Sequence, residues 1–144
     1  MKRKNILVID GHGGKIGSAM LESLRGRLEK AGIDAELTAV GTNYAATMNM
    51  LKCRPDSVAT GENPVIVGCR RADYITGPIG IVIADSLDGE VTPEMARAVG
   101  QSTAERVLIP VNRCNSKIAG IGDQTLAALI NDAVEIIISD LTNE

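Results

Sequence analysis

The sequence predicts an α/β protein in which a mostly parallel sheet of about five strands lies between two layers of helices. Three observations indicate this class. Short apolar runs alternate with helical patterns along the chain, and its opening segment reads as strand, helix, strand. The composition is 44% hydrophobic, yet it contains two Tyr and no Phe or Trp. Such a core must consist of Ile, Val, Leu, Met and Ala, which suits buried parallel strands covered by helices.

The opening segment predicts a β-α-β unit. A buried strand is expected over Lys4–Asp10, where four apolar residues precede a glycine cluster. An amphipathic helix is expected to begin near Ile16 and to end at Gly32, a glycine in the position of a C-terminal cap. A second strand is expected over Asp34–Val40, and a crossover of this length implies that the two strands are parallel. The unit is Rossmann-like.

The middle of the chain carries less decisive patterns. A helix is expected from Tyr44 to Cys53, and Asn63 followed by proline indicates another helix start. Val65–Val67 reads alternatively as a short strand. Tyr74–Thr76 reads as a strand, whereas the apolar run Ile79–Ala84 fits either a buried helix or a strand.

The C-terminal third predicts a helix capped by Thr92, a strand over Arg106–Val111 and a short strand over Lys117–Ile121. The terminal helix is expected to begin at Asp123 as its N-cap. The absence of a linker, repeat or low-complexity segment predicts one domain over residues 1–144.

Composition narrows the function classes. The formal net charge is −3 and the pI is near 5.2, so we expect no nucleic-acid partner and no anionic membrane partner. No apolar stretch approaches the length of a membrane span, and the expected location is cytoplasmic. Three irregularly spaced cysteines and a single histidine, His12, argue against a disulfide framework and against a metal site.

The strongest chemical signal is a glycine-rich segment between the first strand and the first helix. It fits the pattern G-x-x-G-x-x-G through three glycines, which permit a tight turn and a close approach of backbone to a phosphate. The start of the helix offers free N–H groups to an anion, and a lysine adds a full charge. The candidate phosphate-binding residues are Gly11, His12, Gly13, Gly14, Lys15, Ile16 and Gly17. The alternative is a glycine turn that only packs.

One element of a dinucleotide site is missing. Such sites place an Asp or Glu at the end of the second strand to bind ribose hydroxyls, but this chain has Val40, Gly41, Thr42 and Asn43 there. The cofactor therefore stays open between NAD(P), another nucleotide and a phosphorylated metabolite.

Further polar clusters follow the other predicted strands, where ligands bind in open parallel sheets. The candidate ligand-binding residues of these clusters are Gly41, Thr42, Asn43, Gly77, Pro78, Asn112 and Arg113. Arg113 is a candidate second anion clamp, whereas Asn43 fits a plain helix cap equally well. His12 and Cys114 are the candidates for chemistry, with an ordinary loop histidine and a buried cysteine as the alternatives. Asp10 is expected to steady the loop, and the acidic turn Asp85–Glu90 to be solvated.

With these motifs assembled, the chain resembles a family of small uncharacterised proteins from clostridia-like bacteria, a domain of unknown function. The motifs that carry the resemblance are the glycine loop, Gly41-Thr42-Asn43, Ala59–Asn63, Gly77–Ile81, Gly89–Pro93 and Ile109–Asn115. The resemblance covers nearly the whole chain and implies a compact Rossmann-like protein without an assigned reaction. The glycine loop alone is similar to those of pyridine-nucleotide reductases and short-chain dehydrogenases.

Three functional hypotheses follow. The first is a sensor or carrier of a nucleotide or phosphorylated metabolite, bound by the glycine loop. The second is a small NAD(P)-linked oxidoreductase whose site is completed at a subunit interface, and the third is a structural assembly partner. A homo-oligomer is expected, because the apolar runs Ile79–Ala84 and Ile136–Ile138 exceed what one thin domain readily covers.

Overall fold

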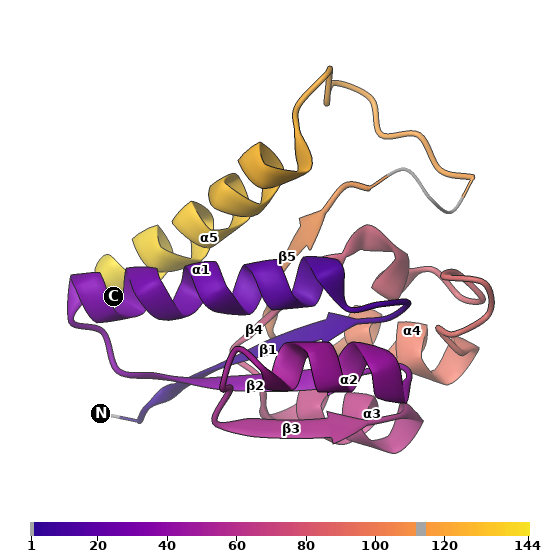
Figure 1. The fold of residues 1–144 in the computed structure, drawn as a ribbon, viewed down its shortest axis with the longest axis horizontal. Helices are drawn as coiled ribbons and strands as arrows, with labels where there is room; N and C mark the ends of the chain where they lie inside the picture. Colours follow the sequence, from indigo (N-terminus) through magenta and orange to yellow (C-terminus); the bar gives the residue numbers. More distant parts are fainter. Residues whose placement is uncertain (1, 112–114) are drawn as a thin grey trace.

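The computed structural model describes residues 2–111 and 115–144, and its centre is a parallel five-stranded sheet (Figure 1). The strand order across the sheet is β3-β2-β1-β4-β5, and every neighbouring pair is parallel. This order and the parallel pairing confirm the predicted α/β class and are consistent with a Rossmann-like fold. The strands are β1 (Lys4–Asp10), β2 (Ala35–Gly41), β3 (Ser57–Thr60), β4 (Tyr74–Pro78) and β5 (Glu105–Ile109).

Helices cover both faces of the sheet and complete three layers. One apolar core joins the sheet to α1, α2 and α5, and a second core joins its other face to α3 and α4. None of the helices within residues 2–111 and 115–144 is long and apolar enough to cross a membrane. The helices are α1 (Lys15–Ala31), α2 (Tyr44–Leu51), α3 (Glu62–Arg71), the short 3₁₀ helix η1 (Ile79–Val82), α4 (Pro93–Gln101) and α5 (Leu126–Thr142).

Strand β1 lies in the middle of the sheet, and its side chains explain why both faces are covered. Ile6 and Val8 point into the core shared with α1 and α5, whereas Leu7 and Ile9 point into the core shared with α3 and α4. All four are buried. The strand is apolar on both faces because a parallel sheet in this position meets no water.

Several helix ends confirm the capping predictions. Gly32 adopts the left-handed conformation after α1, with φ of 67°. The side chains of Asn43 and Thr92 accept hydrogen bonds from Ala46 N and Met95 N and so cap α2 and α4. Two predicted caps are wrong. Gly61 precedes α3, so that Asn63 lies inside the helix, and Thr125 rather than Asp123 caps α5.

The ambiguous segments resolve toward helices. Val65–Val67 belongs to α3, and the run 79–84 begins as the 3₁₀ helix η1. Sequence analysis missed β3, whose four residues are all exposed or half-buried, so that no apolar alternation marks them. The predicted strand Lys117–Ile121 is wrong, because these residues are mostly exposed and form no ladder. The fifth strand is therefore β3, at the other edge of the sheet.

The two apolar runs that suggested an oligomer are largely covered by the chain itself. Ile81 of the first run and Ile137 and Ile138 of the second are buried in the two cores. Ile136 alone among the large side chains of these runs is exposed, at 44%. The covering surface that the sequence could not show comes from α4 for the first run, and from the sheet and α1 for the second.

Candidate functional site

The glycine loop lies at the point where the order of the strands reverses. From β1 the chain proceeds outward to β2 and β3, and it then crosses back to β4 on the opposite side of β1. The carboxyl ends of β1 and β4 therefore flank a crevice that no crossover helix closes. Open α/β sheets bind their ligands at this kind of switch point.

Two of the three motif glycines are required by close packing of α1. A Cβ on Gly14 would lie 2.7 Å from the backbone oxygen of Ala46 in α2, and Gly14 is also left-handed, with φ of 73°. A Cβ on Gly17 would lie 2.5 Å from Sδ of Met50. These glycines let α1 pack closely against its neighbours, which is the structural half of the role that the motif predicts.

Asp10 ends β1 and fastens the loop from behind. Its buried carboxylate accepts hydrogen bonds from the amides of Gly11, at 2.8 Å, and Gly17, at 2.7 Å. Burial raises the pKa of Asp10, although these amides and the charge of His12 partly oppose the shift. The prediction that Asp10 steadies the loop is confirmed.

Glu90 is the site residue that sequence analysis missed. Its Oε1 atom accepts hydrogen bonds from the His12 amide at 2.9 Å, and from the Thr42 hydroxyl and the Asn43 side-chain amide at 2.7 Å each. Desolvation by itself would raise the pKa of Glu90, but these donors and the charge of His12 together lower it. The interpretation of residues 85–90 as a merely solvated turn is wrong for Glu90.

The position of Glu90 bears on the missing acid of the dinucleotide pattern. Thr42 and Asn43 directly follow β2, which is where that pattern expects a carboxylate. In this structure the carboxylate of Glu90 reaches these residues from a segment 78 residues beyond His12. No local signal marks such a contact, because Glu90 follows a turn rather than a strand of the β-α-β unit.

His12 belongs to the same cluster. Its Nε2 atom lies 3.1 Å from Oδ2 of Asp88 and 3.8 Å from Oε2 of Glu90. The backbone of His12 is left-handed, with φ of 50°. The two distances show that the ring points toward the acidic turn, so this histidine connects the turn to the glycine loop.

The outer part of the glycine loop stays open. Gly13 and Lys15 are exposed, and a Cβ on Gly13 would meet nothing within 4 Å. The described residues offer no hydrogen-bond partner to the amides of Gly13 and Lys15. Lys15 begins α1, and the first amides of a helix lack partners within the helix, so its amide and that of Gly13 just before the N-cap are available to an anion.

A small cavity of about 130 Å³ lies in front of this loop. It is walled by the glycine loop, by Pro78 at the end of β4 and by three apolar side chains from later segments. Its lining residues are Asp10, Gly11, His12, Gly13, Lys15, Ile16, Pro78, Leu87, Val111 and Leu126. It is smaller than the roughly 300–1,000 Å³ of typical small-molecule pockets, so it has room for only part of a ligand.

A larger cavity of about 440 Å³ adjoins the first. Val111 and Leu126 line both, and the rest of its wall comes from Pro110, from residues between 117 and 124, and from Leu129 in α5. Its lining is mainly apolar, with Lys117 and Gln124 among the polar residues. The two cavities thus place the glycine loop beside a larger compartment that is lined mainly by apolar residues.

The remaining predicted residues divide into three groups. Pro78 lines the small cavity, whereas Gly41 and Gly77 pack against other parts of the protein, namely Thr47 and the carbonyl of Ile9. Thr42 and Asn43 hold Glu90. The candidates Asn112, Arg113 and Cys114 lie outside the described residues.

Other chemistry finds little support in the described part of the chain. Residues 2–111 and 115–144 contain no group of three or more His, Cys, Asp or Glu side chains that could hold a metal ion. Cys53 and Cys69 are free, and burial raises the pKa of Cys69 to about 11, which disfavours a reactive thiolate.

Comparison with known proteins gives a family but no activity. No curated protein and no solved structure matches the chain significantly. One family model, described as a domain of unknown function (DUF3842), matches residues 5–142, nearly the whole chain. The protein therefore belongs to the DUF3842 family.

Proposed function

We propose that this protein binds a phosphate-bearing small molecule, a nucleotide or a phosphorylated metabolite, as a sensor or carrier. The observation that carries the proposal is the cavity at the switch point, in front of a helix start where the amides of Gly13 and Lys15 are open. Lys15 adds a positive charge beside these amides. A helix start with free amides and a nearby cation is a favourable place for a phosphate.

The negative charges near the loop do not prevent this use. The Asp10 carboxylate is buried behind the loop and is turned to the amides of Gly11 and Gly17. Its pKa is raised by burial, and the shift acts in the direction that lessens repulsion of an anion. The charge of Glu90 is offset by three donors, which are the amide of His12 and the side chains of Thr42 and Asn43.

The two cavities indicate the form of the ligand. The small one has room for a phosphate, and the adjoining one, at about 440 Å³, has the size of a small-molecule pocket. Its largely apolar lining suits a flat or apolar organic group. We therefore expect a ligand with an anionic head and an organic body, rather than inorganic phosphate alone.

The hydrogen-bond partners of the titratable groups at the small cavity favour binding over catalysis. The titratable side chains that line the small cavity are Asp10, His12 and Lys15. Asp10 is engaged by two backbone amides, and the His12 ring faces Asp88 rather than a nucleophile. This arrangement suits a sensor or carrier.

A second candidate, a small NAD(P)-linked oxidoreductase, is favoured by one observation. Glu90 lies beside Thr42 and Asn43, at the end of β2, where NAD-binding domains present an acid to the ribose hydroxyls. Its Oε2 atom is the oxygen not engaged by these two residues. This candidate requires that a nicotinamide dinucleotide binds and that Glu90 contributes to its affinity.

Thermal unfolding in the presence of ligands tests both candidates. The ligands are inorganic phosphate, AMP, GMP, adenosine, sugar phosphates, coenzyme A, NAD and NADP. A ligand at about a hundred times its dissociation constant stabilises the folded protein by roughly 2.7 kcal/mol. Stabilisation by phosphorylated compounds but not by adenosine supports the phosphate site, whereas NAD-specific stabilisation that Glu90→Gln abolishes supports the second candidate. If none of these compounds shifts the unfolding temperature, both are wrong and a structural role is favoured.

The variant that tests the loop is Gly13→Val. Its side chain would occupy open space in front of the helix start, and Gly13 is not in the left-handed region. We expect the ligand-induced shift to disappear while the unfolding temperature without ligand is unchanged. Gly26→Ala is the matched control, because Gly26 is an exposed glycine of α1 with nothing within 4 Å of its Cβ position. The control should keep the shift. Gly14 is unsuitable here, since any side chain on it meets Ala46.

A further inference from the structure

The exposed apolar side chains of the described chain are concentrated on α2. Five large hydrophobic residues are exposed, and three of them are Tyr44 (71%), Met48 (39%) and Leu51 (41%). Their spacing of four and then three residues places them on one side of the helix. We call these three residues the α2 stripe. Single exposed apolar residues are ordinary, but a continuous group of this kind indicates an interaction surface.

The α2 stripe faces away from the glycine loop and toward the edge of the sheet. On the α1 side of the helix, the Asn49 side chain donates to the carbonyl of Gly13. On the sheet side, the hydroxyl of Thr47 hydrogen-bonds with Thr60 in β3. The stripe lies beyond Thr47, on the side opposite to Asn49, given about 100° of rotation per residue. Figure 1 shows β3 at the lower margin of the molecule, with α2 lying over it.

Strand β3 is an edge strand whose outer side is open. It pairs with β2 through one side, and the amide of Gly61 donates to the carbonyl of Gly41. Because the amides of a strand point alternately to its two sides, those of Val58 and Thr60 point outward. None of the four residues of β3 is charged. Such an edge lacks the charged side chains and proline that often block pairing with another strand, and its length of four residues limits the pairing to a short ladder.

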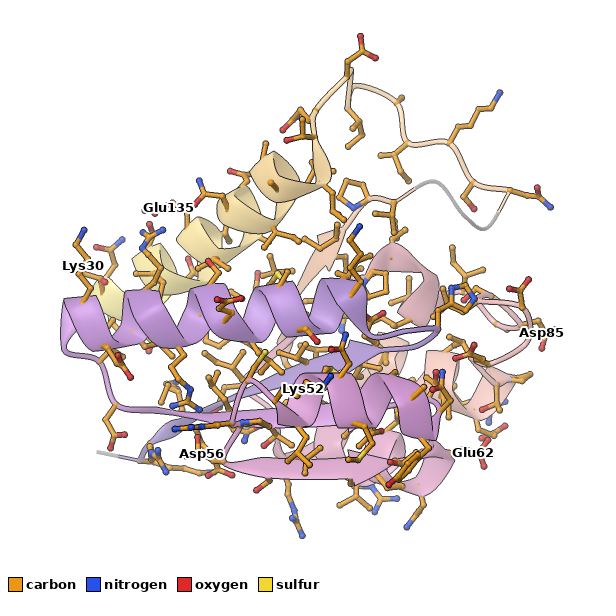
Figure 2. The ribbon with its side chains drawn as sticks, in the orientation of Figure 1. Lys30, Lys52, Asp56, Glu62, Asp85 and Glu135 are labelled. Atoms are coloured by element: carbon orange, nitrogen blue, oxygen red, sulfur yellow. The ribbon has the colours of Figure 1, made fainter. Side chains whose placement is uncertain are left out.

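Charged residues of opposite sign flank this uncharged surface. Lys52 follows the C-terminus of α2, and Glu62 begins α3 at the other end of β3. Figure 2 shows Lys52 and Glu62 as labelled side chains toward opposite ends of this part of the molecule. Lys52 forms no ion pair within the described chain, and the Glu62 carboxylate accepts a hydrogen bond from Thr92.

We propose that a second copy of this chain covers the α2 stripe and the outer edge of β3. A two-fold axis perpendicular to the plane of the sheet, beside β3, would pair the two β3 strands antiparallel. It would keep both copies of α2 on the same face of the joined sheet and bring the two stripes together. The same axis would place Lys52 of each copy opposite the partner's Glu62. The surface is therefore self-complementary, as a two-fold interface requires, with an uncharged centre and a charged rim.

Sedimentation velocity of the full chain over a range of concentrations tests the proposal. We expect dimers of wild type at tens of micromolar and monomers of Met48→Lys under the same conditions. Ile136→Lys is the matched control, because Ile136 is exposed to a similar extent on α5. It should leave the dimer intact. A wild type that is monomeric throughout, or a dimer that Ile136→Lys breaks and Met48→Lys does not, would overturn the proposal.

Charge reversal tests the orientation of the two copies. Lys52→Glu alone and Glu62→Lys alone should each weaken the dimer, because each places like charges opposite one another. The double variant should recover much of the wild-type affinity. If the double variant is weaker than both single variants, the antiparallel arrangement is wrong.

Hydrogen exchange tests the strand pairing without any substitution. The outward amides of Val58 and Thr60 should exchange several-fold more slowly at concentrations where the dimer forms than in the monomer. Exchange at these two amides that does not depend on concentration would contradict pairing through β3. Circular dichroism and thermal unfolding of each variant establish that its fold is retained.

Discussion

The glycine loop, residues 10–17, and the acidic turn, residues 85–90, are two irregular segments that meet at the contact between Glu90 and His12. The loop places a glycine at its left-handed helix start, Gly14. The turn places Asp85, Leu87 and Asp88 in the left-handed region, in addition to Gly89. A non-glycine residue there costs about 1–2 kcal/mol. The loop has one such residue, His12, against three in the turn, so the turn depends more than the loop on contacts with the rest of the protein.

Three kinds of contact hold the turn against the rest of the protein. Leu87 is buried, and its Cδ1 atom would lie 2.9 Å from a Cβ on Gly11, so the leucine occupies the space that this glycine leaves. Asp85 N donates to the carbonyl of Val91 at 2.7 Å. Glu90 adds three hydrogen bonds. A strained turn can therefore complete a site when a packed side chain and a half-buried carboxylate fasten it.

The largest expected effect concerns the loop. Gly14→Val should lower the free energy of unfolding by about 3 kcal/mol. The backbone at this position is left-handed, which valine tolerates poorly, and the new side chain collides with the backbone of Ala46. Urea unfolding monitored by circular dichroism measures the change. Gly13→Val, one residue away in open space, should change stability by less than about 0.5 kcal/mol. Equal losses in the two variants would show that packing against α2 does not distinguish these glycines.

A smaller effect is expected in the turn. Glu90→Ala leaves the donors of His12, Thr42 and Asn43 without their shared acceptor, and it should cost about 2 kcal/mol. Amides of residues 85–91 should then exchange faster, whereas the first amides of α1 that Asp10 binds should not. If the loop opens together with the turn, the two segments form one unit and the contrast between them is wrong.

The charge of Glu90 gives this effect a defined pH dependence. In the folded protein the pKa of Glu90 lies below its ordinary value of 4.5. Its ionised form therefore contributes stability that is present above pH 4.5 and is lost as the pH falls through the lower folded-state pKa. The difference in unfolding free energy between wild type and Glu90→Gln should be largest near neutrality and should disappear in acid. A difference that grows in acid would contradict the lowered pKa.

Segments whose structure is encoded locally were predictable from the sequence, whereas segments that depend on distant contacts were not. The strand, loop and helix of residues 4–32 form a local unit with a buried apolar run, glycines at fixed positions and a capping glycine, so its bounds were predicted almost to the residue. Strand β3 was missed because its four residues are at best half-buried and their strand identity depends on pairing with β2. The predicted strand at 117–121 has apolar residues but no neighbour with which to pair.

The candidate site was predictable to a similar extent. Gly11, Gly13, Lys15 and Ile16 were found because they lie in one motif, and Pro78 because the carboxyl ends of neighbouring strands meet. Glu90, Leu87 and Leu126 come from distant segments whose local sequence indicates only a turn or a helix start. Contacts across such separations follow from the tertiary fold, and a single sequence carries no local record of them.

The smallest expected effect is that of Asp88, the other carboxylate of the turn that approaches His12, and it distinguishes the contribution of Asp88 to stability from that of Glu90. Asp88 lies 3.1 Å from the His12 ring, closer than Glu90 does, but its side chain is 92% exposed and makes no other hydrogen bond within the described chain. An exposed ion pair contributes little, because water screens it and two side chains must be ordered. Asp88→Asn keeps a residue type that tolerates the left-handed conformation. Its midpoint of urea unfolding at neutral pH should therefore equal that of wild type within error. A loss as large as that of Glu90→Ala would mean that the turn is held by its ion pair with His12 rather than by the hydrogen bonds of Glu90.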